Sequence, residues 1–354
     1  MNARIVLMPG DGIGPEVIAA AVQVLGRVAA RFGHSFHFTN TLIGGAALRA
    51  GHPALPPETL AAAKDAQAVL LGAVGDPDFD DRPPAGRPES ALLAMRRELG
   101  VFANLRPARA WNGLENAGPL KPEVLRGTDL VVVRELTGGL YYGRPRGVSA
   151  DGASAVNTMA YTRDEIARVA RVAFRLAQAR RRKLVSVDKA NVLEVSRLWR
   201  DVVIEVARDY PDVQLSHEYV DAAAMKLALA PAAFDVMLTE NMFGDILSDE
   251  AGAICGSLGL LPSASLGDGP GLFEPVHGSA PDLAGKDVAN PVGAMLSAAM
   301  LLSDGLGLQD EGAAVTAAVE RTLSSNQRTV DVAAPGHAPL GTRAFTDAVL
   351  RSLS

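Results

Sequence analysis

Short apolar runs alternate along this chain with longer stretches of helical periodicity. Runs rich in Val and Leu occur at residues 4–8, 67–74, 129–135, 183–190 and 234–238. Runs without polar alternation are typical of strands that are buried on both faces of a parallel sheet. The alternation therefore predicts an α/β protein with a largely parallel sheet covered by helices.

The bulk composition limits the classes of protein to consider. A length of 354 residues predicts two domains, and 48% apolar with 21% charged residues is typical of a soluble globular protein. The net charge of −6 argues against general nucleic-acid binding. The single cysteine, Cys255, cannot form an internal disulfide, and neither a signal peptide nor a run of 18 apolar residues is seen. We therefore expect a cytoplasmic protein that binds no membrane.

Two helix starts and one loop are well marked. Asp164 and Glu165 open an amphipathic pattern that ends in the basic run 180–183, where the helix dipole favours positive charge without any ligand. Asn290 and Pro291 predict an N-cap and a first helical residue. The segment rich in Pro and Gly at 75–90 predicts a long loop, a frequent location of binding residues.

The stretch PGDGIGPEV at 9–17 follows a predicted strand and leads into a helix. Its glycines at 10, 12 and 14 do not fit G-x-G-x-x-G, and the lysine of a P-loop is missing. A Rossmann dinucleotide turn is therefore not supported. A structural tight turn and a ligand-binding loop both stay open.

Three arginines are candidates for binding a small anion. Arg96 and Arg106 lie ten residues apart, and Arg134 directly follows a buried Val run. The planar guanidinium pairs bidentately with carboxylates, which suits a di- or tricarboxylate substrate. The alternative for each is an ordinary surface salt bridge.

Lys189 and Tyr141 are candidates for proton transfer. Lys189 ends a buried strand, and a partly desolvated lysine can act as a base or a proton relay. Its alternative is a salt bridge with Asp188 or Glu194. The alternative for Tyr141 is packing within a strand, as part of a Tyr-Tyr pair.

Two aspartates lie one helical turn apart in TENMFGDILSDE, at 245 and 249. Like charges at this spacing cost about 0.2–0.5 kcal/mol, so the pair is either a solvated acidic edge or a cation site. A third acid, Asp221, would complete the all-oxygen shell that Mg²⁺ or Mn²⁺ prefers. Neither a His/Cys cluster typical of zinc nor a G-x-S-x-G nucleophile motif is present in the sequence.

In combination, seven segments resemble the β-decarboxylating dehydrogenases, a family that includes isocitrate, homoisocitrate, tartrate/malate and 3-isopropylmalate enzymes. They span essentially the whole chain and are PGDGIGPEV (9–17), LGAVG (71–75), FANLRP (102–107), VVRELTGGLYYG (132–143), VDKANVLE (187–194), TENMFGDILSDEA (239–251) and EPVHGSAPDLAGKDVANP (274–291). Leu136 and Gly139 in RELTGG are similar to the isopropylmalate branch, since the isocitrate type usually has R-E-N-T-E-G.

The resemblance implies a two-domain α/β fold that is not a Rossmann fold. The first domain would be discontinuous, formed by 1–101 and 256–354, and the second would be 102–255 with a dimer arm at about 140–160. Family members are homodimers with shared active sites, so Lys189 and Asp221 would come from the partner chain.

The resemblance also implies roles for the residues discussed above. Arg96, Arg106 and Arg134 would bind the carboxylates of a malate moiety, with Tyr141 and Lys189 as the acid/base pair. Asp221, Asp245 and Asp249 would hold Mg²⁺ or Mn²⁺, Asp221 also contacting substrate. The cofactor would be NAD, contacted by Ile13, Glu274, His277, Gly278, Ser279, Ala280, Asp282 and Asn290. Asp282 would accept hydrogen bonds from the ribose and repel a 2′-phosphate, which favours NAD over NADP.

The substrate's C3 branch would meet Glu89, Leu92, Leu93 and Val192. Three of these four are apolar, and burying an isopropyl group there would gain roughly 2.4 kcal/mol over malate, at about 0.8 kcal/mol per carbon. Ser90 and the loop arginines Arg82 and Arg87 argue for an acidic branch instead. We expect NAD-dependent oxidative decarboxylation of 3-isopropylmalate to 4-methyl-2-oxopentanoate. The alternatives are homoisocitrate, isocitrate, tartrate or malate as substrate, or, from other classes, a Mg-dependent hydrolase or a non-catalytic binding module.

Overall fold

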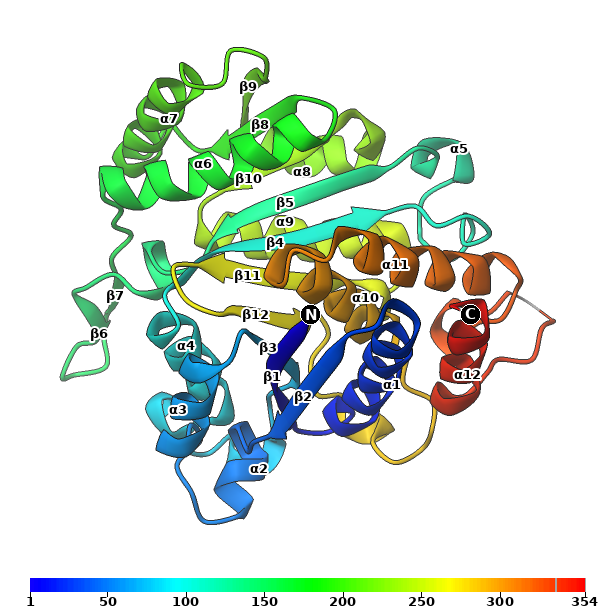
Figure 1. The fold of residues 1–354 in the computed structure, drawn as a ribbon. Coiled ribbons are helices and arrows are strands. Elements are labelled where there is room, and N and C mark those ends of the chain that lie inside the picture. The colour runs from blue at the N-terminus through cyan, green and yellow to red at the C-terminus, as the bar shows by residue number, and fades with distance from the viewer. Residues whose placement is uncertain (335, 354) are drawn as a thin grey trace. The chain divides into compact units, whose positions relative to one another are not determined.

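The computed structural model describes residues 1–334 and 336–353, which form two compact units. Unit 1 comprises Met1–Val101, Trp111–Pro119 and Gly256–Ser354, and unit 2 comprises Phe102–Ala110 and Leu120–Cys255. Unit 1 is thus built from both ends of the chain, coloured blue to cyan and yellow to red in Figure 1.

The sheet of unit 1 has the strand order β2-β1-β3-β12-β11. Its strands are β1 (Asn2–Gly10), β2 (Ser35–Asn40), β3 (Ala68–Ala73), β11 (Pro262–Gly267) and β12 (Gly271–Pro275). All neighbours are parallel except β11 and β12, which form an antiparallel pair. Every residue of β3 is buried, as expected for a central strand covered on both faces.

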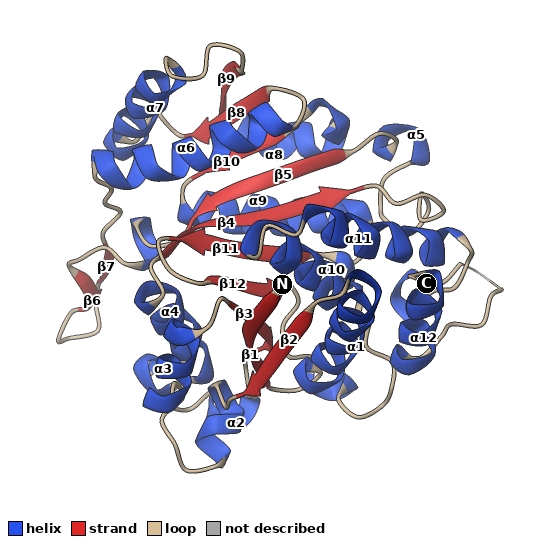
Figure 2. Ribbon diagram, in the orientation of Figure 1, coloured by secondary structure: helices blue, strands red, loops and turns tan. Residues whose placement is uncertain are grey.

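Helices cover this sheet, as Figure 2 shows. They are α1 (Gly14–Phe32), α2 (Gly44–Arg49), α3 (Pro57–Asp65), α4 (Pro88–Glu98), α10 (Val292–Met300), α11 (Gln309–Ser324) and α12 (Thr342–Ser352). Helix α1 packs against α10 and α12 and buries Val17, Ala21, Val24 and Val28, which recur at the helical period.

The sheet of unit 2 has the order β4-β5-β10-β8-β9. Its strands are β4 (Val101–Arg109), β5 (Asp129–Glu135), β8 (Lys183–Asp188), β9 (Gln214–Tyr219) and β10 (Val236–Thr239). β4 and β5 are antiparallel, and the other neighbours are parallel. The helices are α5 (Pro122–Leu125), α6 (Arg163–Ala179), α7 (Glu194–Ala207), α8 (Val220–Leu229) and α9 (Asn241–Cys255).

A small hairpin projects from unit 2 within the segment expected to be a dimer arm (Figure 1). It pairs β6 (Arg146–Val148) with β7 (Ala155–Asn157) in antiparallel fashion, and all six residues are exposed. An isolated two-stranded hairpin is marginally stable in water. Its contact with a partner chain stays a prediction.

The strand and helix predictions agree with the structure, and the α/β fold is confirmed. All five apolar runs form strands. Helix α6 begins one residue before Asp164 with a capping box from Thr162 to Glu165. Helix α10 begins one residue later than expected, because Pro291 is its N-cap rather than its first residue, and the Asn290 side chain accepts a hydrogen bond from Val292 N at 3.0 Å. Among the described residues, no helix has both the length and the apolarity needed to cross a membrane.

The expected domain boundaries need one correction. The segment Trp111–Pro119 was assigned to the second domain but groups with unit 1. Its anchors explain this: Asn112 Nδ2 donates to Glu320 Oε1 at 3.0 Å, and Ser324 Oγ donates to the carbonyl of Asn112 at 3.2 Å. These contacts join sequence-distant positions that no local pattern links.

Candidate active site

Parallel pairing in unit 2 places Arg134 beside the start of helix α9. Thr239 of β10 is in register with Arg134 of β5, and α9 begins two residues later. The helix approaches closely because residue 244 is glycine. A Cβ there would lie 2.3 Å from Thr239 Oγ1 and 2.7 Å from Arg134 Cγ.

Arg134 is buried and held by α9. Its Nε and Nη2 donate to Asn241 Oδ1 at 3.0 and 2.8 Å, and Nη1 donates to Asp245 Oδ1. Because the residue is only 3% exposed, the prediction of a surface salt bridge is wrong for this arginine.

Arg106 of β4 approaches the same helix face. Its Nη1 donates to Ser248 Oγ at 2.8 Å, Asp249 Oδ1 at 3.1 Å and Asp245 Oδ1 at 3.4 Å, and its Nε donates to Asn104 Oδ1 at 2.8 Å. Two arginines therefore offset the like charges of the aspartate pair.

Tyr141 joins this cluster from a short 3-10 turn, Gly139–Tyr141. Its hydroxyl donates to Asp245 Oδ2 at 3.0 Å. Burial, reinforced by the charge of Asp245, raises the pKa of Tyr141 above its ordinary value, so the phenol is protonated at neutral pH. The alternative for Tyr141 was packing within a strand. That alternative is wrong, because Tyr141 lies in a 3-10 turn.

Lys189 follows β8 and pairs with Asp221 at the start of α8, with 2.5 Å between Nζ and Oδ1. This hydrogen bond lowers the pKa of Asp221. The predicted alternatives, Asp188 and Glu194, are wrong because Asp188 binds Arg200 and Glu194 binds Arg197.

The three candidate metal ligands do not gather within one chain. Among the described residues, no group of three His, Cys, Asp or Glu side chains could hold a metal ion. Asp245 and Asp249 supply carboxylate oxygens one turn apart on a partly exposed helix face, a donor set that fits a hard cation such as Mg²⁺. A complete shell then needs ligands from outside this cluster.

Asp245→Asn is expected to raise the Mg²⁺ concentration needed for half-maximal activity by about tenfold, because a neutral amide replaces a charged ligand. Titration calorimetry, which requires no turnover, should show the same loss of affinity for Mg²⁺. Glu250→Gln on the same helix is the matched control and should leave both values unchanged. If Asp245→Asn left the Mg²⁺ requirement unaltered, Asp245 and Asp249 would be a solvated acidic edge rather than a cation site.

In unit 1, Arg96 lies on α4 and is buried with Glu274 of β12, with 2.6 Å between Nη2 and Oε1. Its environment is not that of a surface salt bridge. Arg96 shares one helix face with Glu89, Leu92 and Leu93, at spacings of i, i+3, i+4 and i+7. Leu93 is 42% exposed, which leaves apolar surface for a ligand. Val192, on the turn after Lys189 in unit 2, is exposed as well.

The features that argued for an acidic branch have partners inside the chain. Ser90 Oγ donates to the carbonyls of Arg87 and Ala85 at 2.7 and 3.1 Å. Arg87 Nε donates to the carbonyl of Arg82 at 2.9 Å, and the Arg82 guanidinium stacks on Phe79 at 4.7 Å from the ring centroid. The predicted loop is built from two short turns, Pro77–Phe79 and Pro84–Gly86.

The turn after β1 is pinned by Asp11. Its buried carboxylate accepts hydrogen bonds from the backbone N–H groups of Gly45, Ala46 and Gly75 at 2.9, 2.7 and 2.9 Å. Burial raises the pKa of Asp11, and these three bonds act against that shift. The N–H groups that start α2 thus already hold an anion, so this part of the turn is structural.

The predicted cofactor residues cluster in unit 1 around the loop after β12. Ile13 N donates to the carbonyl of Ser279 at 2.8 Å, and Ala280 adopts a left-handed conformation with φ of +38° that starts the exposed turn carrying Asp282. His277 Nδ1 bonds the carbonyl of the exposed Gly278 at 2.9 Å, while Nε2 is buried with no partner among the described residues. Burial lowers the pKa of His277, which leaves Nε2 a neutral acceptor suited to an N–H or O–H of a ligand.

Two of the predicted cofactor residues have structural roles as well. Glu274 neutralises Arg96, as described above. Asn290 Oδ1 accepts from Val292 N just before α10, and its Nδ2 donates to Asp331 Oδ2 at 2.9 Å. Their contacts with a cofactor stay predictions.

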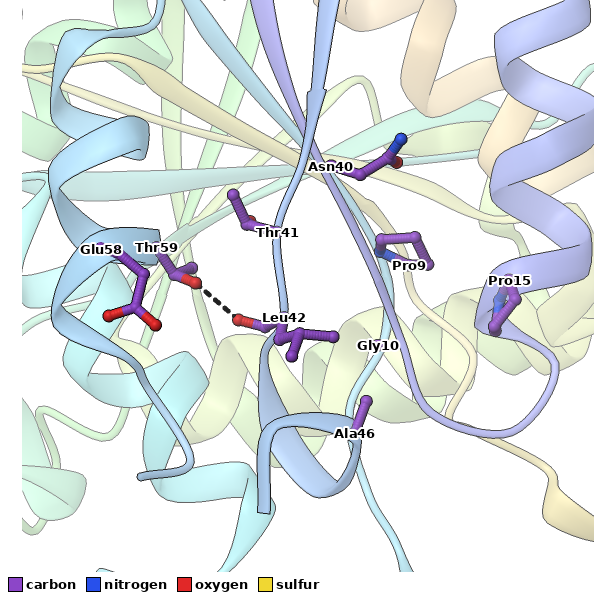
Figure 3. A pocket seen from close by; sticks show the side chains of 9 residues that line it. All are labelled: Pro9, Gly10, Pro15, Asn40, Thr41, Leu42, Ala46, Glu58 and Thr59. Carbon is purple, nitrogen blue, oxygen red and sulfur yellow. Dashed lines mark hydrogen bonds between the residues drawn. The ribbon is translucent and has the colours of Figure 1, made fainter. Parts of the chain in front are cut away.

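A cavity of about 520 Å³ lies in unit 1 beyond the ends of β1 and β2. Figure 3 shows Thr59 closing one side through its hydrogen bond to the Leu42 carbonyl, at 2.7 Å. The described residues that line it include none of the predicted site residues: Pro9, Gly10, Pro15, Asn40, Thr41, Leu42, Ala46, Glu58 and Thr59.

The family model for isocitrate/isopropylmalate dehydrogenase matches residues 4–349. The chain belongs to the isocitrate/isopropylmalate dehydrogenase family. It is 55% identical, with 100% of both sequences covered, to the 3-isopropylmalate dehydrogenase of Anaeromyxobacter dehalogenans. It is 57% identical to that of Bacillus subtilis, over 94% of this chain and 92% of the relative.

Solved structures agree with this membership. A crystal structure of isocitrate dehydrogenase from Methylococcus capsulatus superposes with a TM-score of 0.88 at 34% identity, covering 99% of both chains. A β-decarboxylating dehydrogenase from Thermococcus kodakarensis gives 0.81 at 39% identity, covering 99% of this chain and 96% of the other. The chain is thus a β-decarboxylating dehydrogenase, which rules out the hydrolase and the binding module.

Several residues that shape the site were missed at the sequence level. Asn241 and Ser248 hold the two arginines, and Glu135 accepts from Thr137 N and Gly138 N, at 2.8 Å each, to form the turn that leads to Tyr141. Asn241 is a polar residue where a strand passes into a helix, which is also typical of an ordinary helix start, so the local sequence carried no signal for it.

Proposed function

We propose that this chain catalyses the NAD-dependent oxidative decarboxylation of 3-isopropylmalate, the reaction of leucine biosynthesis that yields 4-methyl-2-oxopentanoate, CO₂ and NADH. The observation that carries the proposal is the cluster at the start of α9, where Arg134, Arg106 and Tyr141 all bond Asp245. This arrangement offers positive charge for a carboxylate beside a protonated phenol and a hard oxygen ligand.

The arginines bind and orient the substrate. Arg106 and Arg134 present guanidinium groups from adjacent strands of unit 2, and the family resemblance gives Arg96, on α4 of unit 1, the same role. A buried arginine attracts a carboxylate more strongly than an exposed one, because water screens its charge less. They hold the carboxylates of a malate moiety so that the C2–H and the C3 carboxylate have a fixed orientation.

Two side chains move protons. Lys189 takes the proton from the C2 hydroxyl, and Tyr141, protonated at neutral pH, gives a proton to C3 once CO₂ has left. Asp245, Asp249 and Asp221 would hold a divalent cation, which would supply Lewis-acid polarisation of the C2 oxygen, and bound NAD would supply the hydride acceptor.

A homodimer explains the separation of the acidic residues. Asp221 pairs with Lys189 rather than joining Asp245 and Asp249, which is consistent with the family arrangement that we propose here, in which a second copy supplies Lys189 and Asp221 to the cluster on α9. Helices α8 and α9 pack together and expose Met225, Leu229 and Ile246, apolar surface that a second copy would cover. We also propose that the dimer is cytoplasmic.

The face of α4 that carries Leu92 and Leu93 favours a substrate with an apolar C3 branch. An isopropyl group against Leu92 and Leu93 needs no polar partner, whereas a carboxylate there would lose hydration at a cost of several kcal/mol. The side chains that would compensate an acid, those of Ser90, Arg82 and Arg87, are engaged within the loop.

NAD is expected to be preferred over NADP by about 10²-fold in kcat/KM, since Asp282 repels a 2′-phosphate. The assay follows absorbance at 340 nm with 3-isopropylmalate and Mg²⁺, and mass spectrometry identifies 4-methyl-2-oxopentanoate. Asp282→Asn should lower the ratio of kcat/KM with NAD to kcat/KM with NADP. Asp310 is an acid on α11, and Asp310→Asn serves as the control. Equal kcat/KM values for the two coenzymes would contradict the role of Asp282, and failure to form the oxo acid would contradict the proposed function.

A further inference from the structure

Asn241 is buried at the first position of α9, and both ends of its carboxamide are engaged. It is 1% exposed. Its Oδ1 accepts from Nε and Nη2 of Arg134 at 3.0 and 2.8 Å, and its Nδ2 donates to the carbonyl of Gly138 at 3.2 Å. One amide thus bridges strand β5 and the turn that follows it.

Each end of the amide leads to a chemical group of the candidate site. Asn241 binds Nε and Nη2 of Arg134. The remaining nitrogen, Nη1, donates to Asp245 Oδ1. Gly138 directly precedes the turn that carries Tyr141, whose hydroxyl donates to the other oxygen of Asp245. The arginine and the phenol are therefore fixed relative to each other through Asn241.

Capping of the helix does not account for this side chain. Glu240 already caps α9, because its Oε1 accepts from Phe243 N at 2.7 Å and its Oε2 from Met242 N at 3.0 Å. The backbone N–H of Asn241 donates to the Tyr161 hydroxyl at 3.0 Å, a bond that any residue except proline would keep at this position.

An amide is the side chain that serves both ends. Leucine has a similar size but offers neither donor nor acceptor. Aspartate keeps the acceptor for Arg134 but places a carboxylate oxygen against the Gly138 carbonyl, where both groups are acceptors.

We propose that Asn241 is a positioning residue that sets the orientation of Arg134 and of the Tyr141 turn at once. Its role rests on the proposed function, which gives Arg134 the substrate carboxylate and Tyr141 the proton transfer. The arginine end of the amide therefore governs substrate affinity, and the Gly138 end governs turnover.

The test is a double-mutant cycle with Asn241→Leu and Tyr141→Phe. Asn241→Leu alone should raise the Kd for 3-isopropylmalate about tenfold, measured by calorimetry with Mg²⁺ and without NAD, and lower kcat by about 10²-fold. In the Tyr141→Phe background the effect on kcat should largely vanish, while the effect on Kd remains. Ser186→Ala is the control: it removes a buried hydrogen bond to Trp199 in the same unit and should lower the melting temperature without changing either constant.

Additive effects on kcat, or an unchanged Kd and kcat in folded Asn241→Leu, would overturn the role of Asn241. Should the leucine variant fail to fold, Asn241→Asp is taken through the same cycle. This variant keeps the acceptor for Arg134. It should lower kcat in the wild-type background but not in the Tyr141→Phe background. Absence of 3-isopropylmalate turnover by the wild type would overturn the proposed function and this role together, whereas an active wild type with an additive cycle overturns this role alone.

Discussion

Replacing Lys189 by Met is expected to lower kcat by about 10²–10⁴-fold, the usual contribution of a general base. The folded state should survive, since the Lys189 and Asp221 side chains are 28% and 66% exposed. Exposed pairs of this kind contribute about 0–1 kcal/mol to the free energy of unfolding. Steady-state NADH formation and a thermal melt measure the two effects separately.

Lys226→Met is the matched control for this prediction. Lys226 lies on α8, is also paired with an acid, Glu218, and is as long and flexible as Lys189. It should lose an ion pair of similar strength yet keep wild-type turnover. A Lys189→Met enzyme with wild-type kcat at neutral pH would show that Lys189 is structural and that another group takes the proton.

The double variant Leu92→Ala/Leu93→Ala is expected to reduce the preference for 3-isopropylmalate over malate by about tenfold. The full preference is expected to be about fiftyfold, from three buried carbons at roughly 0.8 kcal/mol each, and most of that contact would depend on the two leucines. Both lie on a partly exposed helix face, so the fold should tolerate the change. The ratio of the two kcat/KM values measures the effect.

Leu258→Ala, at another exposed leucine of unit 1, controls for a general loss of apolar surface and should leave the ratio unchanged. If Leu92→Ala/Leu93→Ala kept the full preference, the isopropyl group would bind elsewhere. The metal and proton-transfer proposals and the roles of Arg106 and Arg134 would be unaffected, because those residues lie outside this face, which only Arg96 of the three arginines shares.

Local chemistry made much of this fold predictable. The strands β5 and β8 are Val-rich runs buried by helices, and α6 begins at a capping box that is visible as Thr162 and Glu165. The paired arginines and aspartates were recognisable because charges in apolar surroundings need partners. Tyr141 and Lys189 were selected with the help of the family resemblance, since a lone tyrosine or lysine has ordinary explanations.

What could not be predicted depends on contacts between distant parts of the chain. Asn241 binds Arg134, which lies 107 residues earlier, and nothing in the local sequence distinguishes it from an ordinary helix-start residue. The pairing of Arg96 with Glu274 spans 178 residues, and that of Asn112 with Glu320 spans 208. Such pairs follow from strand order, which hydrophobic periodicity does not encode.

Comparison of kcat/KM for 3-isopropylmalate, malate, isocitrate, homoisocitrate and tartrate, each with NAD and Mg²⁺, tests the central claim most directly. The account predicts 3-isopropylmalate first, malate about fiftyfold lower, and isocitrate lowest or undetectable, because its carboxylate branch would meet Leu92, Leu93 and Glu89 without a partner. A higher kcat/KM for isocitrate or homoisocitrate than for 3-isopropylmalate would contradict it.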